Sequence, residues 1–278
     1  MSAQPPPELD PAVADYYGRA PEELRLEQGS SSLEALRTRE LIDRHARRPP
    51  ATVLDVGGAA GYYALGLAEA GYTVHLVDAV PRLVEEAQRR SATRSRPLAS
   101  CRLGDARALE LPDQSVDIVL LLGPLYHLTD AAERDRALRE ARRVLRPGGQ
   151  LFAAAISRWA SALDGLSRDL FRDPRFKAIV ERDLQEGQHR NPTERLDYFT
   201  TAYLHRPDEL RAEVLAADLA LDGLYGIEGP GWILSDVAER LEDPRRCADL
   251  LQVARQFESD PAILGVSAHL LAVARRPS

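Results

Sequence analysis

The segment Thr52–Asp78 constrains the fold of this chain more than any other stretch. It holds an apolar run at Val53–Val56, a glycine-rich turn, a helical pattern of apolar residues between Ala64 and Ala68, and a second apolar run that ends on Asp78. Short apolar runs on either side of a helical pattern predict a β-α-β unit. A unit of this kind holds a nucleotide-like ligand beside the turn that follows its first strand.

The residues of the turn suit close contact with such a ligand. Gly57, Gly58 and Gly61 allow the backbone to turn sharply and to approach a ligand closely, because no Cβ intrudes. The helix that begins near Gly61 would point its free N–H groups at the ligand. Asp78 lies 21 residues after Gly57 and could accept hydrogen bonds from ribose hydroxyls. Asp55 could accept from the N–H groups of the turn or face a cationic group.

The spacing of the glycines separates the candidate ligands. A dinucleotide fingerprint needs glycines at i, i+2 and i+5. Counted from Gly57, the second and third positions hold Ala59 and Tyr62; counted from Gly58, they hold Ala60 and Tyr63. A nicotinamide-dependent oxidoreductase is therefore disfavoured. The turn also lacks the G-K-[ST] sequence of a P-loop, which argues against a triphosphate ligand.

The turn sequence D-V-G-G-A-A-G resembles the first motif of class I S-adenosylmethionine-dependent methyltransferases, whose common form is [DE]-x-G-x-G-x-G. Asp55, Gly57 and Gly61 match this form, and Ala59 stands where the middle glycine is usual. By this resemblance the chain is similar to members of the family that act on small molecules.

Further segments resemble the same family in the expected order. Ser100–Asp105 ends a third strand at an acidic residue, like the family motif that meets the adenine. Ser115–Leu122 is a fourth, apolar strand, followed by the sequence G-P-L-Y-H-L. Leu145–Phe152 (L-R-P-G-G-Q-L-F) is similar to the family's turn into strand five. The resemblance covers about residues 50–157.

The resemblance implies S-adenosyl-L-methionine as cofactor and S-adenosyl-L-homocysteine as product. The positions implied to bind the cofactor follow the family motifs, and they are Asp55, Gly57, Gly58, Gly61, Asp78, Ala79, Asp105, Ala106 and Leu122. In many relatives an N-terminal helical segment closes over the cofactor pocket, which adds Tyr16, Tyr17 and Arg37 as cofactor-binding positions.

The alternation of strands and helices predicts an α/β fold with a doubly wound, mainly parallel sheet. The family's sheet has seven strands with an antiparallel last strand, which is assigned to 268–274. Four parts are expected: an N-terminal helical segment over the cofactor pocket (1–48), the cofactor-binding Rossmann-like core (49–157), an inserted helical lid (158–206) and the C-terminal part of the core (207–278).

Methyl transfer from a sulfonium is an in-line displacement, so the main task of such an enzyme is to align donor and acceptor. A general base is needed only where the acceptor carries a proton that must leave early. His127 follows the fourth strand and is the candidate base, with Tyr126 beside it as a candidate catalytic residue; packing into the sheet is the alternative for either one. His189, Tyr198 and Trp232 are candidate acceptor-binding residues.

Composition excludes several classes of protein. The net charge of −7 disfavours binding to a nucleic-acid backbone. The two cysteines, Cys101 and Cys247, form neither a disulfide framework nor a zinc ribbon. The histidines show no metal-binding spacing, and His75 and His269 lie within predicted strands, so both are expected to be structural and no metal is expected. The sequence shows no leader and no apolar run near 18 residues, and this predicts a soluble cytoplasmic protein without a membrane partner. The N-terminal helix or the lid could support a homodimer.

Three functions fit the motifs. The first is a methyltransferase that acts on a small molecule at O, N or C. The second is an enzyme that consumes the same donor without methylating, for instance by intramolecular cyclisation. The third is a non-catalytic protein that binds S-adenosylmethionine; loss of Asp78 or of the glycines would be its hallmark, and all of these residues are present.

Overall fold

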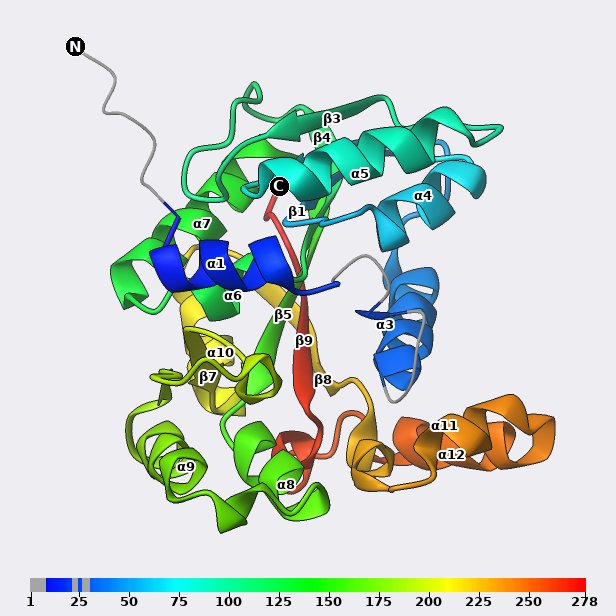
Figure 1. Ribbon diagram of the computed structural model, residues 1–278. Helices are drawn as coiled ribbons and strands as arrows, with labels where there is room; N and C mark the ends of the chain where they lie inside the picture. Colours follow the sequence, from blue (N-terminus) through cyan, green and yellow to red (C-terminus); the bar gives the residue numbers. More distant parts are fainter. Residues whose placement is uncertain (1–8, 22–24, 27–30) are drawn as a thin grey trace.

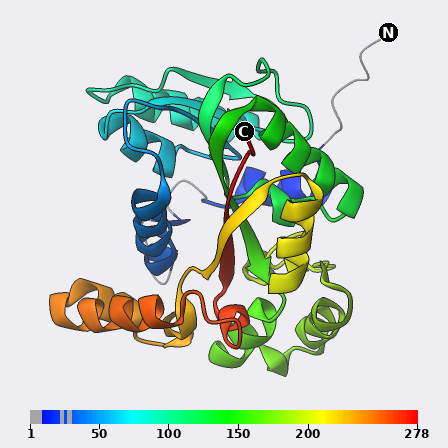
Figure 2. The same cartoon turned by 180° about the vertical axis from the view of Figure 1, so that it is seen from behind.

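A computed structural model describes residues 9–21, 25–26 and 31–278. A twisted sheet crosses the molecule, with helices on both faces (Figures 1 and 2). Its parallel part has the order β3-β2-β1-β4-β5. These strands are β1 (Thr52–Val56), β2 (Thr73–Asp78), β3 (Ser100–Leu103), β4 (Val116–Leu121) and β5 (Leu145–Ser157). The β-α-β unit predicted from the sequence is therefore present.

Beyond β5 the sheet ends with the antiparallel strand that the sequence predicts. β9 (His269–Arg275) runs antiparallel to β5 on one side and to β8 (Ala220–Gly226) on the other. The predicted fold class, a doubly wound and mainly parallel sheet with an antiparallel last strand, is confirmed.

The sheet contains two short strands that the sequence analysis did not predict, so that the described residues form nine strands rather than seven. β7 (Ala202–His205) pairs in parallel with the end of β5, and β6 (Gln188–His189) pairs with β7. Both lie in the segment expected to be a helical lid. The helices of this segment are α8 (Ala160–Ser167) and α9 (Pro174–Glu186), with 3-10 turns η1 (Leu170–Arg172) and η2 (Leu196–Tyr198). The strands β6 and β7 have only two and four residues, which is too short for the alternating pattern that predicts a strand from sequence.

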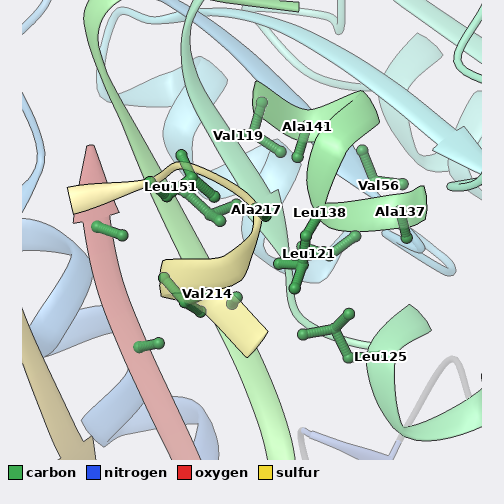
Figure 3. Close-up of a cluster of buried hydrophobic side chains, with 14 of the residues drawn as sticks. Val56, Val119, Leu121, Leu125, Ala137, Leu138, Ala141, Leu151, Val214 and Ala217 are labelled. Carbon is green, nitrogen blue, oxygen red and sulfur yellow. The ribbon is translucent and has the colours of Figure 1, made fainter. Parts of the chain in front are cut away.

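Alternate side chains of the strands enter two separate cores, because successive residues of a strand point to opposite faces. On one face, Val56, Val119 and Leu121 point toward α7 (Ala131–Val144), as Figure 3 shows. This face is also covered by α10 (Pro207–Ala216). On the other face the strands pack against α3 (Ser31–His45), α4 (Tyr62–Glu69) and α5 (Pro81–Ala92).

The helix α7 illustrates why these segments are helical. The side chain of Asp130 accepts a hydrogen bond from the Ala132 N–H group and caps the first turn. Ala137, Leu138, Ala141 and Val144 recur at helical spacing and are fully buried against the sheet. Capping and the apolar stripe together position the loop that precedes this helix, which holds α6 (Pro124–His127).

The remaining elements frame the carboxyl edge of the sheet. The helix α1 (Pro11–Arg19) lies across α6 (Figure 1). Between β8 and β9 the chain forms η3 (Gly229–Ile233), α11 (Val237–Glu242), α12 (Pro244–Phe257) and η4 (Leu264–Val266). The pair α11 and α12 projects beside α3 (Figures 1 and 2), where Leu33 packs on Val237 and Leu250. Within the described residues, no helix has both the length and the apolar composition to cross a bilayer.

Candidate active site

A cavity of about 360 Å³ lies at the carboxyl ends of β1, β2 and β4, between α1 and α3. Ligands of doubly wound sheets bind at this edge. The cavity wall brings together most of the residues that the sequence analysis selected. These are Tyr17, Asp55, Gly57, Gly58, Asp78, Ala79, Asp105, Ala106, Leu122, Tyr126 and His127.

The glycine-rich turn is held in a strained form that only a few residue types accept. Gly57 has a φ of +70°, and a Cβ there would lie 2.7 Å from Cδ of Pro124. Ala59 has a φ of +47°, a left-handed conformation that costs an alanine roughly 1–2 kcal/mol. The Ala59 N–H group donates to Oδ2 of Asp78 at 2.8 Å, and the Val80 N–H group donates to Oδ1 at 2.8 Å. Asp78 therefore holds the turn in addition to facing the cavity.

Asp55 lies below the turn in an environment that disfavours its charge. Its side chain is buried, and Oδ2 has no hydrogen-bond partner within the described residues. Burial, together with the nearby charge of Asp78, raises the pKa of Asp55 to about 7. A cationic group of a ligand in this cavity would supply the missing partner, which is what the ammonium group of an S-adenosylmethionine molecule offers.

Asp105 is fixed by a local ion pair. Its carboxylate accepts from the Arg107 backbone N–H at 2.7 Å and from the Arg107 guanidinium at 2.6 and 2.9 Å. Arg107 also donates to Glu133 at 2.5 Å. Asp105, Arg107 and Glu133 all line the cavity, so this end of the wall is polar and rigid.

His127 is neutral and paired with Tyr17. Its Nδ1 lies 3.1 Å from the Thr201 carbonyl oxygen, which can only accept, so Nδ1 carries the proton. Nε2 then accepts from the Tyr17 hydroxyl at 2.8 Å. Burial lowers the pKa of His127 to about 4. The pair therefore presents a neutral base and a phenol to the same cavity.

The helix α1 closes this part of the cavity through contacts from three directions. Besides the Tyr17–His127 bond, the Thr200 hydroxyl donates to the Ala12 carbonyl at 2.9 Å. Arg82 on α5 donates to the Tyr17 and Ala20 carbonyls at 2.8 and 2.9 Å. Arg82 therefore joins the end of α1 to the helix that follows β2. Residues 22–24 and 27–30 of the expected N-terminal segment lie outside the described residues.

Three expected cofactor positions do not line the cavity. Gly61 lies behind the turn at the start of α4, with a φ of +84°. Tyr16 packs edge-on against Phe199, with ring centroids 5.3 Å apart. Arg37 is fully buried and donates to the Ile227 carbonyl at 3.1 Å and to the carboxylates of Glu40 and Glu258. The guanidinium of Arg37 is therefore paired within the protein, where it joins α3 to the segment after β8.

The expected acceptor residues lie at a second, smaller cavity. His189, Tyr198 and Trp232 line a space of about 140 Å³ under the 158–206 segment, away from the glycine turn. His189 contacts Asp183 and the Tyr198 carbonyl, both at 2.8 Å, and Trp232 donates to the Val266 carbonyl at 2.8 Å. The polar atoms of His189 thus bond within the 158–206 segment, and Trp232 joins η3 to η4.

The cavity wall also contains residues that the motifs did not indicate, and four of these form the end next to α3: Glu34, Thr38, Tyr63 and His269. His269 had been expected to be structural because it lies in a strand. It is the first residue of an antiparallel strand, however, and therefore sits at the carboxyl edge of the parallel strands. The strand direction was the signal that could have placed it at the site.

The contacts of His269 favour an ion pair over a metal centre. Ligand atoms of Glu34, Glu228 and His269 lie within 4.8 Å of one another, as in a cation site. Yet Nδ1 of His269 lies 2.5 Å from Glu228, and a carboxylate there can only accept its proton. Burial alone would lower the pKa of His269, but Glu34 and Glu228 outweigh it and raise the pKa to about 9. A protonated ring has no lone pair for a metal.

Comparison with known proteins agrees with this geometry. Residues 54–153 match the family model of the methyltransferase domain. A ubiquinone/menaquinone biosynthesis C-methyltransferase from Acidiphilium cryptum is 35% identical over 131 residues, which are 46% of this chain and 51% of the relative. Across the first three curated relatives, the matching part spans 32–51% of their lengths.

Two solved structures show the same fold over nearly the whole chain. A putative methyltransferase in complex with the Haloferax volcanii Trm112 methyltransferase activator has a TM-score of 0.61 and 21% identity, over 96% of this chain and 98% of that one. The [4+2]-cyclase SpnF has a TM-score of 0.53 and 19% identity, over 88% and 80%. The fold is the class I, Rossmann-like fold of S-adenosylmethionine-dependent methyltransferases. Residues 54–153 are the part of the chain that matches the methyltransferase-domain model.

Proposed function

We propose that the chain is an S-adenosylmethionine-dependent methyltransferase that acts on a small-molecule acceptor. One observation supports this most directly: a single cavity gathers the Gly57 turn, Asp78, Asp105 and the residues after β4, within the segment that matches the methyltransferase domain. The unpartnered Asp55 oxygen suits the ammonium group of the donor.

The cofactor supplies an activated methyl group, and the chain supplies alignment. Asp105 and Ala106 would bind the adenine, Asp78 the ribose, and Asp55 the ammonium group. The acceptor would then lie beyond the turn, near Tyr17 and His127. Holding both reactants in line can supply several kcal/mol of the barrier reduction.

His127 is suited to receive a proton from the acceptor through Tyr17. Nε2 already accepts the Tyr17 hydroxyl proton, so an acceptor O–H or N–H group bound to the Tyr17 oxygen could pass its proton along this bond. The lowered pKa keeps Nε2 unprotonated at neutral pH, and it also makes the ring a weaker base than an ordinary histidine, so the proton would have to move together with the methyl transfer. In this proposal His127 acts as the base and Tyr17 as the relay.

A small-molecule acceptor is favoured by the size and cover of the cavity. A space of about 360 Å³ under α1 suits a compact organic molecule better than a polymer. The net charge of −7 also opposes the approach of a phosphate backbone. We therefore infer that the acceptor is a free small molecule and not part of a polymer.

One solved structure with this fold supports an alternative function that does not involve methyl transfer. The solved structure named a [4+2]-cyclase shares this fold, so the fold alone does not require methylation. Two incubations with the donor would separate these reactions. Consumption of the donor in the absence of an acceptor indicates a reaction without methyl transfer. Release of S-adenosylhomocysteine only after an acceptor is added indicates methyl transfer.

Calorimetric titration of the purified protein with S-adenosylhomocysteine tests the proposal, with NADH as the control ligand. We expect S-adenosylhomocysteine to bind and NADH not to bind. Binding of NADH, or no binding of either ligand, would contradict the proposed function.

The role of His127 is tested by His127→Ala and Tyr17→Phe. Once an acceptor is known, both variants should turn over at least about 10-fold more slowly, which is the lower range for loss of a positioned base. Both should bind S-adenosylhomocysteine within about threefold of wild type. His75→Gln, which lies on β2 beside Ser100 and outside the cavity, is the matched control. An unaltered rate in His127→Ala would reduce His127 to a packing role.

A further inference from the structure

The end of the cavity next to α3 contains polar groups that no part of the cofactor assignment uses. His269, Thr38 and Tyr63 all line this end. The Thr38 and Tyr63 hydroxyl oxygens are buried and lie close to each other, and neither makes a regular hydrogen bond to any other described residue. Buried hydroxyls with incomplete hydrogen bonding are costly, so a ligand that bonds to them would recover part of that cost.

His269 is held in one orientation by Glu228. The buried Glu228 carboxylate accepts from His269 Nδ1 at 2.5 Å, from the His269 backbone N–H at 3.0 Å and from the Ser267 hydroxyl at 2.6 Å. Nε2 of His269 has no partner within the described residues, and the ring lines the cavity. Glu228 is thus a positioning residue that leaves Nε2–H facing a ligand.

The charges around this ring are balanced without the ligand. Glu34 lies 3.9 Å from Nδ1 of His269, but Arg25 donates to Glu34 at 2.6 and 3.3 Å. Burial alone would raise the pKa of Glu34, whereas Arg25 and His269 together lower it. Glu228 pairs with His269. With each carboxylate paired to a cation, the groups left to face a ligand are donors: Nε2–H of His269 and two hydroxyls.

The position of this end favours the acceptor over the donor. The sheet order β1-β4-β5-β9 puts His269 three strand spacings from the glycine turn, roughly 14 Å at about 4.8 Å per strand, whereas Tyr63 follows the turn directly, on the first turn of α4. The residues assigned to adenine and ribose lie on the other side of that turn, at β2 and β3. A donor that extends from β3 to β1 leaves the β5–β9 end to the second reactant.

We propose that His269, Thr38 and Tyr63 form a carboxylate-binding subsite that selects acceptors bearing a carboxylate group. Two carboxylate oxygens can accept from all three donors, which a single carbonyl or phenol oxygen cannot do as well. The proposal rests on the proposed function, since it assigns the remaining end of the same cavity to the acceptor.

The test uses benzoate as the probe and benzamide as its neutral isostere, titrated into protein saturated with S-adenosylhomocysteine. Wild type should bind benzoate at least about 10-fold more tightly than benzamide. His269→Gln and Thr38→Val should each lose most of this preference. His75→Gln and Thr73→Val, which change the same residue types outside the cavity, should retain it.

A second titration tests whether the carboxylate bound at the subsite belongs to the donor or to the acceptor. S-adenosylhomocysteine carries a carboxylate, and 5′-methylthioadenosine lacks that arm. Both should bind His269→Gln within threefold of wild type. Selective weakening of S-adenosylhomocysteine would assign the subsite to the donor and overturn the proposal, as would equal binding of benzoate and benzamide by wild type. If wild type fails to bind S-adenosylhomocysteine, the proposed function fails, and the benzoate preference measured without it still decides the subsite.

Discussion

At the scale of single residues, the site combines titratable groups whose pKa values are shifted away from their ordinary ranges. Asp55 is buried with an unpartnered oxygen and a pKa raised to about 7, and His269 has a pKa raised to about 9. His127 has a pKa lowered to about 4. At neutral pH the two histidines of one cavity therefore differ in charge: His127 accepts hydrogen bonds and His269 donates them. This difference in charge is why His127 is proposed as a base and His269 as a hydrogen-bond donor to a carboxylate.

Asp55 gives a prediction about proton release. If the ammonium group of the ligand pairs with Asp55, it stabilises the charged carboxylate and lowers the pKa below 7. Binding of S-adenosylhomocysteine near pH 6.5 should then release a substantial fraction of a proton, seen calorimetrically as a dependence of the binding enthalpy on buffer ionisation. Asp55→Asn should abolish this dependence. The same buffer dependence in both proteins would show that the proton comes from elsewhere.

Gly57 gives a prediction about the turn. Gly57→Ala places a Cβ 2.7 Å from Pro124 on a backbone with a φ of +70°. Strain of this kind costs about 1–3 kcal/mol, so we expect a lower unfolding free energy in urea and weaker binding of S-adenosylhomocysteine. Gly148→Ala is the control, because it has a φ of +75° but open space around it. Equal affinity in the two variants would mean that the close approach at Gly57 is unimportant.

Asp78 gives a prediction about the donor. Asp78→Ala should weaken S-adenosylhomocysteine by about 1.5–3 kcal/mol, from lost hydrogen bonds to a charged group. Part of this loss reflects the turn, since Asp78 also holds the Ala59 N–H group. Asp222→Asn on β8, far from the turn in the sheet order, should bind as wild type does. Unchanged affinity of Asp78→Ala would remove the ribose assignment.

At the scale of elements, the β-α-β unit and the strands that follow it could be predicted because each has a local pattern. β7 could not, because Ala202–His205 is short and its partner Ile156 lies far away in the sequence. The same limit applies to side chains. Arg37 and His269 pair with Glu258 and Glu228, which are distant in the chain, so these contacts could not be predicted from the sequence. Motif spacing locates the glycine-turn end of the cavity, whereas the end that we propose for the acceptor is assembled by residues of α3, α4 and β9.

The attachment of α1 gives a prediction at the same scale. Arg82 is the link between α5 and the end of α1, through the Tyr17 and Ala20 carbonyls. Arg82→Gln should loosen α1, so hydrogen exchange of the amides in 11–19 should become faster while those of α7 stay as protected as in wild type. Bound S-adenosylhomocysteine should slow this exchange. Unchanged protection of α1 in Arg82→Gln would show that Tyr17 and Thr200 hold it without Arg82.

At the scale of the whole molecule, the polar clusters of the cavity should make stability depend on pH. The pKa of His269 is about 9 in the folded protein and about 6.5 in the unfolded chain. Between pH 6.5 and 9 the folded state therefore binds a proton that the unfolded state has lost. Its stabilising contribution is complete below pH 6.5 and is lost as the pH rises to 9. Thermal unfolding of wild type should therefore show a larger fall in Tm between pH 6.5 and 9 than that of His269→Gln. Arg25, Glu34 and Glu228 are the charged groups that face the ring. Parallel curves for the two proteins would contradict the raised pKa.

The cover over the cavity has a consequence for the time course of turnover. Segment 158–206 is hydrogen-bonded to the sheet through β7, whereas α1 is held by side chains at Tyr17, Arg82 and Thr200. On the proposed function, the spent cofactor should therefore leave by detachment of α1, and we expect this step to be slower than transfer between aligned reactants. A rapid first turnover followed by a slower steady rate is the kinetic signature of such an exit.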